Sequence, residues 1–330
     1  MDAQIEGILR HQLLDRRGRL QDAIPVVAER APLVRLLEQV DEALARMDQG
    51  TYGLCEVCNE AVEGQRLLVD PLLRNCLDHL TAEQQRTLER DLDLARHLQQ
   101  ELLPRRDARL DGWEIDYHYE PVGPVSGDYC DVMQLPDGDT FFALGDVSGK
   151  GIAASMLMSH LHAIFRSLGS IELPMDEMIS RANRLFCEST TPSFFATLVC
   201  GRAGGTGEVQ ICSAGHPPAL WASGGQITRI EAGGLPLGLF CSGDYQVSRI
   251  RMEPGDALVL YSDGLSEAAH PRLGEYGLDR LSALVGARYS EAPGALIGAC
   301  LADLRSFLDG AGRTDDLTIL AMRRQYPPVS

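Results

Sequence analysis

The stretch Thr140-Phe-Phe-Ala-Leu-Gly-Asp-Val-Ser-Gly-Lys-Gly151 joins a strand-like apolar run to an acidic, glycine-rich loop. Three more acidic motifs lie far apart in the chain, each at the edge of an apolar run: Ser126-Gly-Asp128-Tyr-Cys-Asp131, Tyr261-Ser-Asp263-Gly-Leu265 and Thr314-Asp315-Asp316-Leu-Thr318. A single aspartate of this kind is typical of a turn or a helix cap. As a set delivered to one place, however, the carboxylates repel each other and are costly to bury. Mg²⁺ and Mn²⁺ remove that repulsion because they prefer oxygen ligands, so the motifs predict a two-metal hydrolase.

Length and composition limit the class of protein. A chain of 330 residues exceeds one typical domain, and 45% hydrophobic with 23% charged residues is ordinary for a soluble globular protein. The net charge of −17 argues against general binding to nucleic acid or anionic membranes. The sequence shows no signal pattern and no apolar run of about 18 residues, so we expect a cytoplasmic protein without a membrane span. Its nine cysteines are odd in number and unevenly spread, which favours mostly reduced thiols.

The amino-terminal part predicts two small modules. Residues 1–50 have helical spacing of apolar residues with breaks near Pro25 and Pro32, which indicates a helical hairpin. Residues 51–80 follow the pattern C-x₂-C-x₁₇-C-x₂-H, which is typical of one structural zinc ion, with unliganded core thiols as the alternative. The four predicted ligands are Cys55, Cys58, Cys76 and His79.

Residues 33–80 also resemble the zinc finger of the DnaK-suppressor/TraR family. The resemblance lies in the run from Gly50-Thr-Tyr-Gly-Leu-Cys55 through Leu67 and Pro71 to Cys76. That family usually has cysteine as the fourth ligand, and His79 departs from it. Such fingers occur in proteins that act on RNA polymerase, but a finger alone does not transfer that role.

Residues 81–104 predict one helix that Pro104 ends. Thr81-Ala-Glu-Gln84 is a capping-box pattern at its start. Leu88, Leu92, Ala95 and Leu102 fall on one stripe, with Gln99 at the missing heptad position. The stripe fits either a coiled-coil linker that pairs two chains or a helix packed on its own domain.

Residues 105–330 predict a layered α+β sandwich. Strand-like runs at 140–144, 195–200, 208–212, 257–261 and 317–321 are separated by glycine-rich turns. Helical spacing occurs at 152–169, 173–190, 276–288 and 293–309. Strands interleaved with two helical pairs favour this architecture over regular βαβ repeats.

An ordered set of motifs in this region resembles the bacterial branch of metal-dependent type 2C protein phosphatases, the stage II sporulation E-like group. The set runs from Gln99-Gln-Glu-Leu-Leu-Pro104 through Gly112-Trp-Glu-Ile115, Ser126-Gly-Asp-Tyr129, Gly145–Gly151, Ala214-Gly-His-Pro217 and Gly234-Leu-Pro-Leu-Gly238 to Tyr261-Ser-Asp-Gly264 and Asp315-Asp-Leu-Thr318. The resemblance implies two antiparallel sheets flanked by helices, with two Mn²⁺ or Mg²⁺ ions between them.

The same resemblance implies a role for each acidic residue. Asp146 would bridge both ions and Val147 would offer its carbonyl, while Asp128 would lie on the side of the second ion. Asp263 and Asp315 would hold the first ion, with Asp316 as the reserve candidate. Ser148 stands where many type 2C phosphatases have a histidine that protonates the leaving group. Lys150 can contact phosphate or remain a solvated loop lysine, and the turn at His216 favours a hydrogen-bonding role.

The implied activity is hydrolysis of phosphoserine or phosphothreonine by a metal-bridging hydroxide. In this bacterial group the substrate is typically an anti-sigma-factor antagonist. The alternative is a zinc-finger transcription regulator or scaffold whose phosphatase domain is catalytically silent. Because the helix at 81–104 directly follows the zinc module, occupancy of the module or partner binding is a further candidate for regulation.

Overall fold

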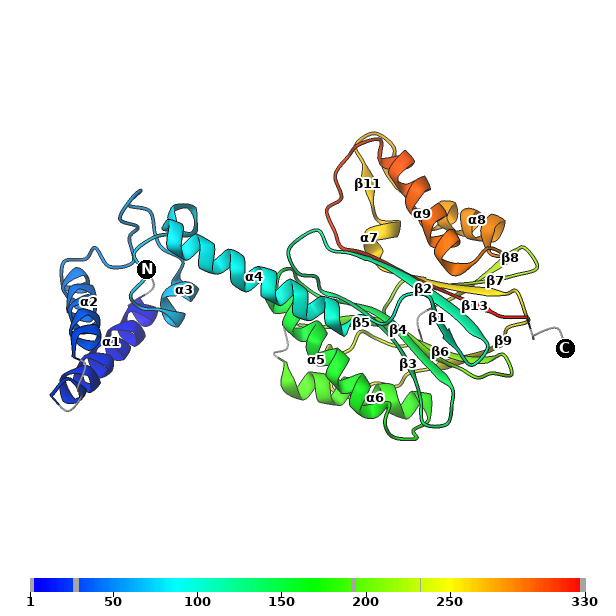
Figure 1. Cartoon of the computed structure of the whole chain (residues 1–330), viewed down its shortest axis with the longest axis horizontal. Coiled ribbons are helices and arrows are strands. Elements are labelled where there is room, and N and C mark those ends of the chain that lie inside the picture. Colours follow the sequence, from blue (N-terminus) through cyan, green and yellow to red (C-terminus); the bar gives the residue numbers. More distant parts are fainter. Residues whose placement is uncertain (1–2, 26–29, 191–193, 232, 327–330) are drawn as a thin grey trace. The chain divides into compact units, whose positions relative to one another are not determined.

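The structure is a computed structural model that describes residues 3–25, 30–190, 194–231 and 233–326. The described chain divides into two compact units, Met1–Asp91 and Leu92–Ser330 (Figure 1). The predicted break near Pro25 adjoins residues 26–29, which lie outside the described residues. The finer division at residues 50, 80 and 104 stays a prediction.

The first unit begins with two helices, α1 (Ala3–Ala23) and α2 (Ala31–Asp48). Leu9 and Leu13 of α1 and Val40 of α2 are fully buried in one apolar cluster. Pro32 occupies the first turn of α2, where its missing N–H has no helical partner to lose. The predicted helices are therefore present, and the proline marks the start of the second one.

The zinc-module region contains the short helices α3 (Gly64–Val69) and η1 (Leu77–His79), followed by the long helix α4 (Ala82–Leu102). The predicted capping box is confirmed at the start of α4. The Thr81 N–H donates to Gln84 Oε1 over 3.0 Å, and the Gln84 N–H donates to Thr81 Oγ1 over 3.2 Å.

The second unit contains two larger sheets in which every strand pair is antiparallel. One has the order β1 (Ala108–Leu110), β2 (Trp113–Glu120), β13 (Leu317–Arg324), β10 (Ala257–Tyr261), β7 (Ala219–Ser223), β8 (Gln226–Ile230). The other has the order β3 (Asp128–Gln134), β4 (Thr140–Val147), β5 (Ala196–Ala203), β6 (Glu208–Ala214), β9 (Val247–Arg251). A small hairpin, β11 (Ala269–His270) and β12 (Gly274–Glu275), lies apart from them.

Helices cover the outer face of each sheet (Figure 1). The helices α5 (Ile152–Leu168) and α6 (Met175–Ser189) pack on the five-stranded sheet, and α8 (Leu278–Arg288) and α9 (Pro293–Leu308) pack on the six-stranded one. The two helix–sheet interfaces form separate cores, and a third core lies between the sheets. This α-β-β-α arrangement confirms the predicted α+β sandwich.

Strand β2 shows how the sequence produces these layers. Trp113, Ile115 and Tyr117 alternate with more exposed residues and enter the core between the sheets. The first six of the eight residues in β4, in contrast, are buried consecutively because this strand lies between a helix layer and the other sheet.

The structure pairs Cys187, near the end of α6, with Cys241 in a disulfide, and leaves seven cysteines free. This pair was not predicted because 54 residues separate its members and only the tertiary fold brings them together. Within the described residues, no helix combines the length and apolarity that a bilayer crossing requires.

Candidate metal centres

The predicted acidic centre begins with two neighbouring strands of the five-stranded sheet. Asp128 is the first residue of β3, Asp146 is near the end of β4, and the antiparallel register places them opposite each other. Directly opposed residues in such a pair have Cβ atoms about 4.5–5.5 Å apart. Asp128 is 1% exposed. Two carboxylates are thus held side by side, one of them fully buried.

The six-stranded sheet contributes the other two carboxylates. Asp263 begins the short helix α7 (Asp263–Ser266) directly after β10, and Asp315 lies just before β13, the neighbour of β10. Asp263 and Asp315 line one small cavity together. Gly264 allows this approach, since a Cβ at that position would lie 1.8 Å from the carbonyl oxygen of Asp316.

Electrostatics link the contributions of the two sheets. Burial, followed by the carboxylates of Asp263 and Asp315, raises the pKa of Asp146 to about 7. Burial, followed by the carboxylate of Asp146, raises the pKa of Asp128 well above its ordinary value. Burial and then Asp315 also raise the pKa of Asp263. The centre therefore carries an excess of negative charge that a multivalent cation would offset.

The backbone around these carboxylates leaves space for such cations. A Cβ on Gly127 would lie 3.0 Å from the Val147 carbonyl oxygen and 3.2 Å from Asp146 Oδ1. A side chain at 127 would thus enter the space between these oxygens. An all-oxygen donor set with this opening fits Mg²⁺ or Mn²⁺.

Asp316 has a different environment from Asp315. Its Oδ1 accepts the Val122 N–H over 2.7 Å, and its Oδ2 accepts the Ser126 hydroxyl over 2.6 Å and the Gly127 N–H over 3.2 Å. Asp315 instead contacts Lys150, whose ammonium lies 3.0 Å from Asp315 Oδ2 and donates to the Thr314 carbonyl over 2.8 Å. Both carboxylate oxygens of Asp316 are hydrogen-bonded to the 122–127 loop. Asp315 is therefore the more accessible of the two as an oxygen donor to a metal ion.

Sequence reasoning did not identify several residues that support this centre. The Thr318 hydroxyl on β13 donates to Asp128 Oδ2, and the Asp128 N–H donates to Ser126 Oγ over 2.9 Å. Ser126 and Thr318 both belong to the quoted motifs, but small hydroxyl residues beside aspartates are too common to be assigned a role from sequence.

His216 has the predicted hydrogen-bonding role. It is 4% exposed, and Nε2 lies 3.1 Å from the Tyr261 carbonyl oxygen while Nδ1 lies 2.9 Å from Thr197 Oγ1. Burial lowers the pKa of His216 to about 3. The neutral ring therefore connects β5 to the end of β10, immediately before Asp263.

Ser148, two residues after Asp146, pairs with Phe195. Its hydroxyl accepts the Phe195 N–H over 3.0 Å, and its own N–H donates to the Phe195 carbonyl over 2.8 Å. These bonds fix the start of the glycine-rich loop.

The four predicted zinc ligands lie together in the first unit. One ligand atom from each of Cys55, Cys58, Cys76 and His79 lies within 4.8 Å of all the others. The Sγ atoms of Cys58 and Cys76 are 3.8 Å apart, and Cys76 Sγ lies 3.3 Å from His79 Nδ1. A tetrahedral zinc ion with Zn–S bonds of about 2.3 Å places two sulfur atoms about 3.8 Å apart. The cluster therefore has the dimensions of a zinc site.

Backbone contacts bring the two halves of this cluster together. The Cys55 N–H donates to the Glu60 carbonyl over 2.8 Å, closing the first turn, and the Glu56 N–H donates to the Arg74 carbonyl over 3.0 Å, joining it to the second half. Burial opposes ionisation of the Cys55 thiol, but backbone N–H groups led by that of Cys58 lower its pKa to about 6. Among the described residues, the acidic side chains do not form a group of three or more ligand atoms as compact as this cluster.

Comparison with known structures assigns the fold of the second unit. The SiaA-PP2C domain of Pseudomonas aeruginosa aligns with a TM-score of 0.63 at 18% identity, covering 74% of this chain and 99% of that one. The RsbU and RsbW domains of Rv1364c from Mycobacterium tuberculosis align with a TM-score of 0.59 at 29% identity, covering 67% of this chain and 63% of that one. The α+β sandwich is therefore the type 2C phosphatase fold.

The family assignment is equally direct. The family described as Stage II sporulation protein E (SpoIIE) matches residues 136–325, and the chain belongs to this family. Protein IcfG of Synechocystis sp. is 26% identical over 263 residues, which are 71% of this chain and 41% of that protein. Phosphoserine phosphatase RsbU of Bacillus subtilis is 28% identical over 186 residues, 56% of this chain and 55% of that protein. The chain thus spans about half the length of these relatives.

Proposed function

We propose that this chain is a metal-dependent phosphatase that hydrolyses phosphoserine or phosphothreonine on a regulatory protein. The observation that carries the proposal is the opposed pair Asp128 and Asp146, of which Asp146 lies close enough to Asp263 and Asp315 for their charges to raise its pKa. Membership of the SpoIIE family and the presence of named phosphoserine phosphatases among the relatives support this activity.

In this proposal the ions would be Mn²⁺ or Mg²⁺, held by Asp128, Asp146, the Val147 carbonyl, Asp263 and Asp315. Such a pair, when bound, supplies activation of water near neutral pH and neutralisation of phosphoryl charge. Pairing of β3 with β4 holds Asp128 opposite Asp146, and the Thr318 hydroxyl donates to Asp128. The hydrogen bond between His216 and the Tyr261 carbonyl fixes the end of β10, close to Asp263. Contact between Lys150 and substrate phosphate stays a prediction, because the Lys150 ammonium is hydrogen-bonded to Asp315 in this structure.

The substrate is proposed from the relatives. Phosphoserine phosphatases RsbU and RsbP of Bacillus subtilis match 56% and 54% of this chain. By resemblance to this bacterial group, we infer that the substrate is a phosphorylated anti-sigma-factor antagonist. The cellular location that fits this role is the cytoplasm.

The amino-terminal unit has a structural role in the same proposal. Cys55, Cys58, Cys76 and His79 would hold one structural zinc ion in a finger of the DnaK-suppressor/TraR type. Pairing of two chains through α4 stays a prediction. The predicted stripe for such a contact contains Leu88, Leu92, Ala95 and Leu102, of which Leu88 is 39% exposed.

The test is hydrolysis of p-nitrophenyl phosphate and of a phosphoserine peptide with Mn²⁺. We expect Asp146→Asn and Asp263→Asn to reduce the rate at least 100-fold, because each removes a charged donor from the centre. Equal rates in wild type and both variants would favour the alternative of a regulator with a silent phosphatase domain. Incubating phosphoproteins from cell extract with the active enzyme would then identify the substrate.

A further inference from the structure

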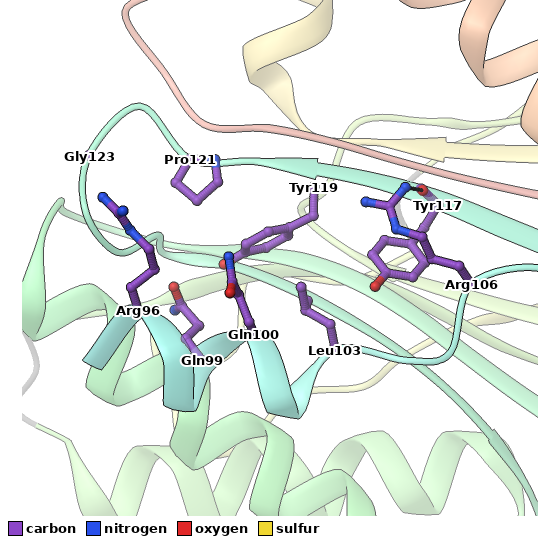
Figure 2. A pocket seen from close by; sticks show the side chains of 9 residues that line it. All are labelled: Arg96, Gln99, Gln100, Leu103, Arg106, Tyr117, Tyr119, Pro121 and Gly123. Carbon is purple, nitrogen blue, oxygen red and sulfur yellow. Dashed lines mark hydrogen bonds between the residues drawn. The ribbon is translucent and has the colours of Figure 1, made fainter. Parts of the chain in front are cut away.

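Gln99 of α4 is a buried polar side chain that the proposed chemistry does not use. It is 4% exposed, whereas its neighbour Gln100 on the same helix is exposed. Both side chains line a cleft of about 470 Å³ between α4, strand β2 and the loop after β2. Figure 2 shows the two glutamines on neighbouring positions of the helix, close to Tyr119 and the loop that contains Gly123.

The Gln99 amide makes a two-point contact with one backbone residue. Its Nε2 donates to the Ser126 carbonyl over 2.8 Å, and its Oε1 accepts the Ser126 N–H over 3.0 Å. The second Nε2 hydrogen is directed at Ser155 Oγ on α5, over 3.2 Å. Ser126 lies before the start of β3, so the glutamine satisfies the backbone groups that a neighbouring strand would otherwise pair.

Ser126 in turn connects directly to the acidic centre. Its hydroxyl donates to Asp316 Oδ2 over 2.6 Å and accepts the Asp128 N–H over 2.9 Å. The position of Ser126 therefore determines where β3 begins and where the Asp128 carboxylate lies.

We propose that Gln99 is a positioning residue that sets the geometry of the metal site by fixing Ser126, and through it Asp128 and Asp316. The inference rests on the proposed function, because it assumes that Asp128 faces a bound ion. Without the amide, two buried backbone groups of Ser126 lose their partners and the segment 122–127 moves to find others. The ligand set is then less well formed before any ion binds.

The test compares the full-length variants Gln99→Met and Gln100→Met. Methionine matches glutamine in length and flexibility but forms no amide hydrogen bonds, so the pair separates the hydrogen bonds from side-chain volume. Mn²⁺ is titrated into each protein, with the cysteine site already loaded with Zn²⁺, and binding is followed by electron paramagnetic resonance without substrate. Loss of groups that orient metal ligands typically weakens binding by about 10- to 100-fold. We expect that range for Gln99→Met and a change of less than about twofold for Gln100→Met.

Kinetics with p-nitrophenyl phosphate give the second readout. We expect the kcat of Gln99→Met to recover towards the wild-type value as Mn²⁺ is raised, with KM for the ester little changed. A partly unfolded variant would also recover as Mn²⁺ is raised, because binding stabilises the folded state, so circular dichroism of the metal-free proteins separates the two cases. The proposal expects a wild-type spectrum for Gln99→Met. Wild-type Mn²⁺ affinity in Gln99→Met would overturn the proposal.

Two further proteins keep the outcomes distinct. If Gln99→Met does not fold, Ser126→Ala removes the hydroxyl contacts while it keeps the backbone contact with Gln99, and it should show the same weakening of Mn²⁺ binding. Wild-type affinity in Ser126→Ala would then overturn the proposal. Asp146→Asn tests the proposed function itself. If the wild type binds no Mn²⁺ and has the same activity as Asp146→Asn, the proposed function is wrong. If the wild type binds Mn²⁺ and is active, and Gln99→Met has the same Mn²⁺ affinity, only the role of Gln99 is rejected.

Discussion

The adjacent residues Asp315 and Asp316 should respond to substitution in opposite ways. Asp316 accepts hydrogen bonds from Val122, Ser126 and Gly127. Val122 is 51% exposed, so water can replace its partner, but Ser126 and Gly127 are buried. Each buried donor left unpaired costs about 1–3 kcal/mol. With two such donors, we therefore expect Asp316→Ala to lower the free energy of unfolding by about 2–6 kcal/mol.

Asp315 makes an exposed ion pair with Lys150. Exposed pairs of this kind contribute about 0–1 kcal/mol, and removing the charge also relieves repulsion with Asp263. Asp315→Ala should therefore change the unfolding free energy by less than about 1 kcal/mol. Its Mn²⁺ affinity, in contrast, should fall at least tenfold if Asp315 is a ligand as proposed, because the centre then loses a charged oxygen donor.

The assay is urea unfolding of the metal-free protein, followed by tryptophan fluorescence. Both tryptophans, Trp113 and Trp221, lie in the six-stranded sheet, so the signal reports on the second unit. Calorimetric titration with Mn²⁺ supplies the affinities. A stable Asp316→Ala variant that no longer binds Mn²⁺, together with an Asp315→Ala variant that still does, would refute this division of roles.

Three other perturbations test separate parts of the structure. Cys55→Ser should reduce bound zinc from one ion to none per chain, measured by mass spectrometry of the metal content, while the double substitution Cys200→Ser and Cys212→Ser should leave zinc bound. Gly127→Ala should weaken Mn²⁺ binding and lower the stability by about 1–3 kcal/mol through overpacking, because its Cβ would lie 3.0 Å from the Val147 carbonyl oxygen. Unchanged Mn²⁺ affinity in this variant would contradict the assignment of the space beside Gly127 to a metal ion. His216 has a pKa of about 3 when folded, against an ordinary value of about 6.5, so the native state binds fewer protons and loses stability as pH falls from about 6.5 towards 3. The loss at pH 5 should be about 2 kcal/mol, and His216→Gln should lack it when urea midpoints at pH 7 and pH 5 are compared.

Periodicity and capping rules predicted the main elements of the fold closely. The expected helices at 152–169 and 293–309 correspond to α5 and α9 within one residue at each end. The capping box at Thr81 formed because its hydrogen bonds depend only on residues three apart. These features are local, so the sequence contains all the information they require.

Features that depend on tertiary approach were not predicted. Gln99 was noted as a break in an apolar stripe and as the start of the Gln99–Pro104 motif, but its contact with Ser126 was not predicted because the two residues are 27 positions apart. The hydrogen bonds of Asp316 likewise depend on a loop nearly 200 residues earlier in the chain. Sequence reasoning identified the acidic residues as a set and, through the resemblance, preferred Asp315 to Asp316 as a ligand, whereas the hydrogen bonds of Asp316 are visible only in the folded structure.

The hairpin that joins β3 to β4 has a consequence for how this domain can diverge. Its five-residue turn, 135–139, is closed by the Leu135 N–H donating to the Asp139 carbonyl over 2.8 Å. Because successive side chains in a strand point to opposite faces, inserting or deleting one residue here would rotate one acidic partner away from the other. Substitutions in this turn are therefore tolerable, whereas a change in its length by a single residue separates two carboxylates that lie at the far end of the hairpin.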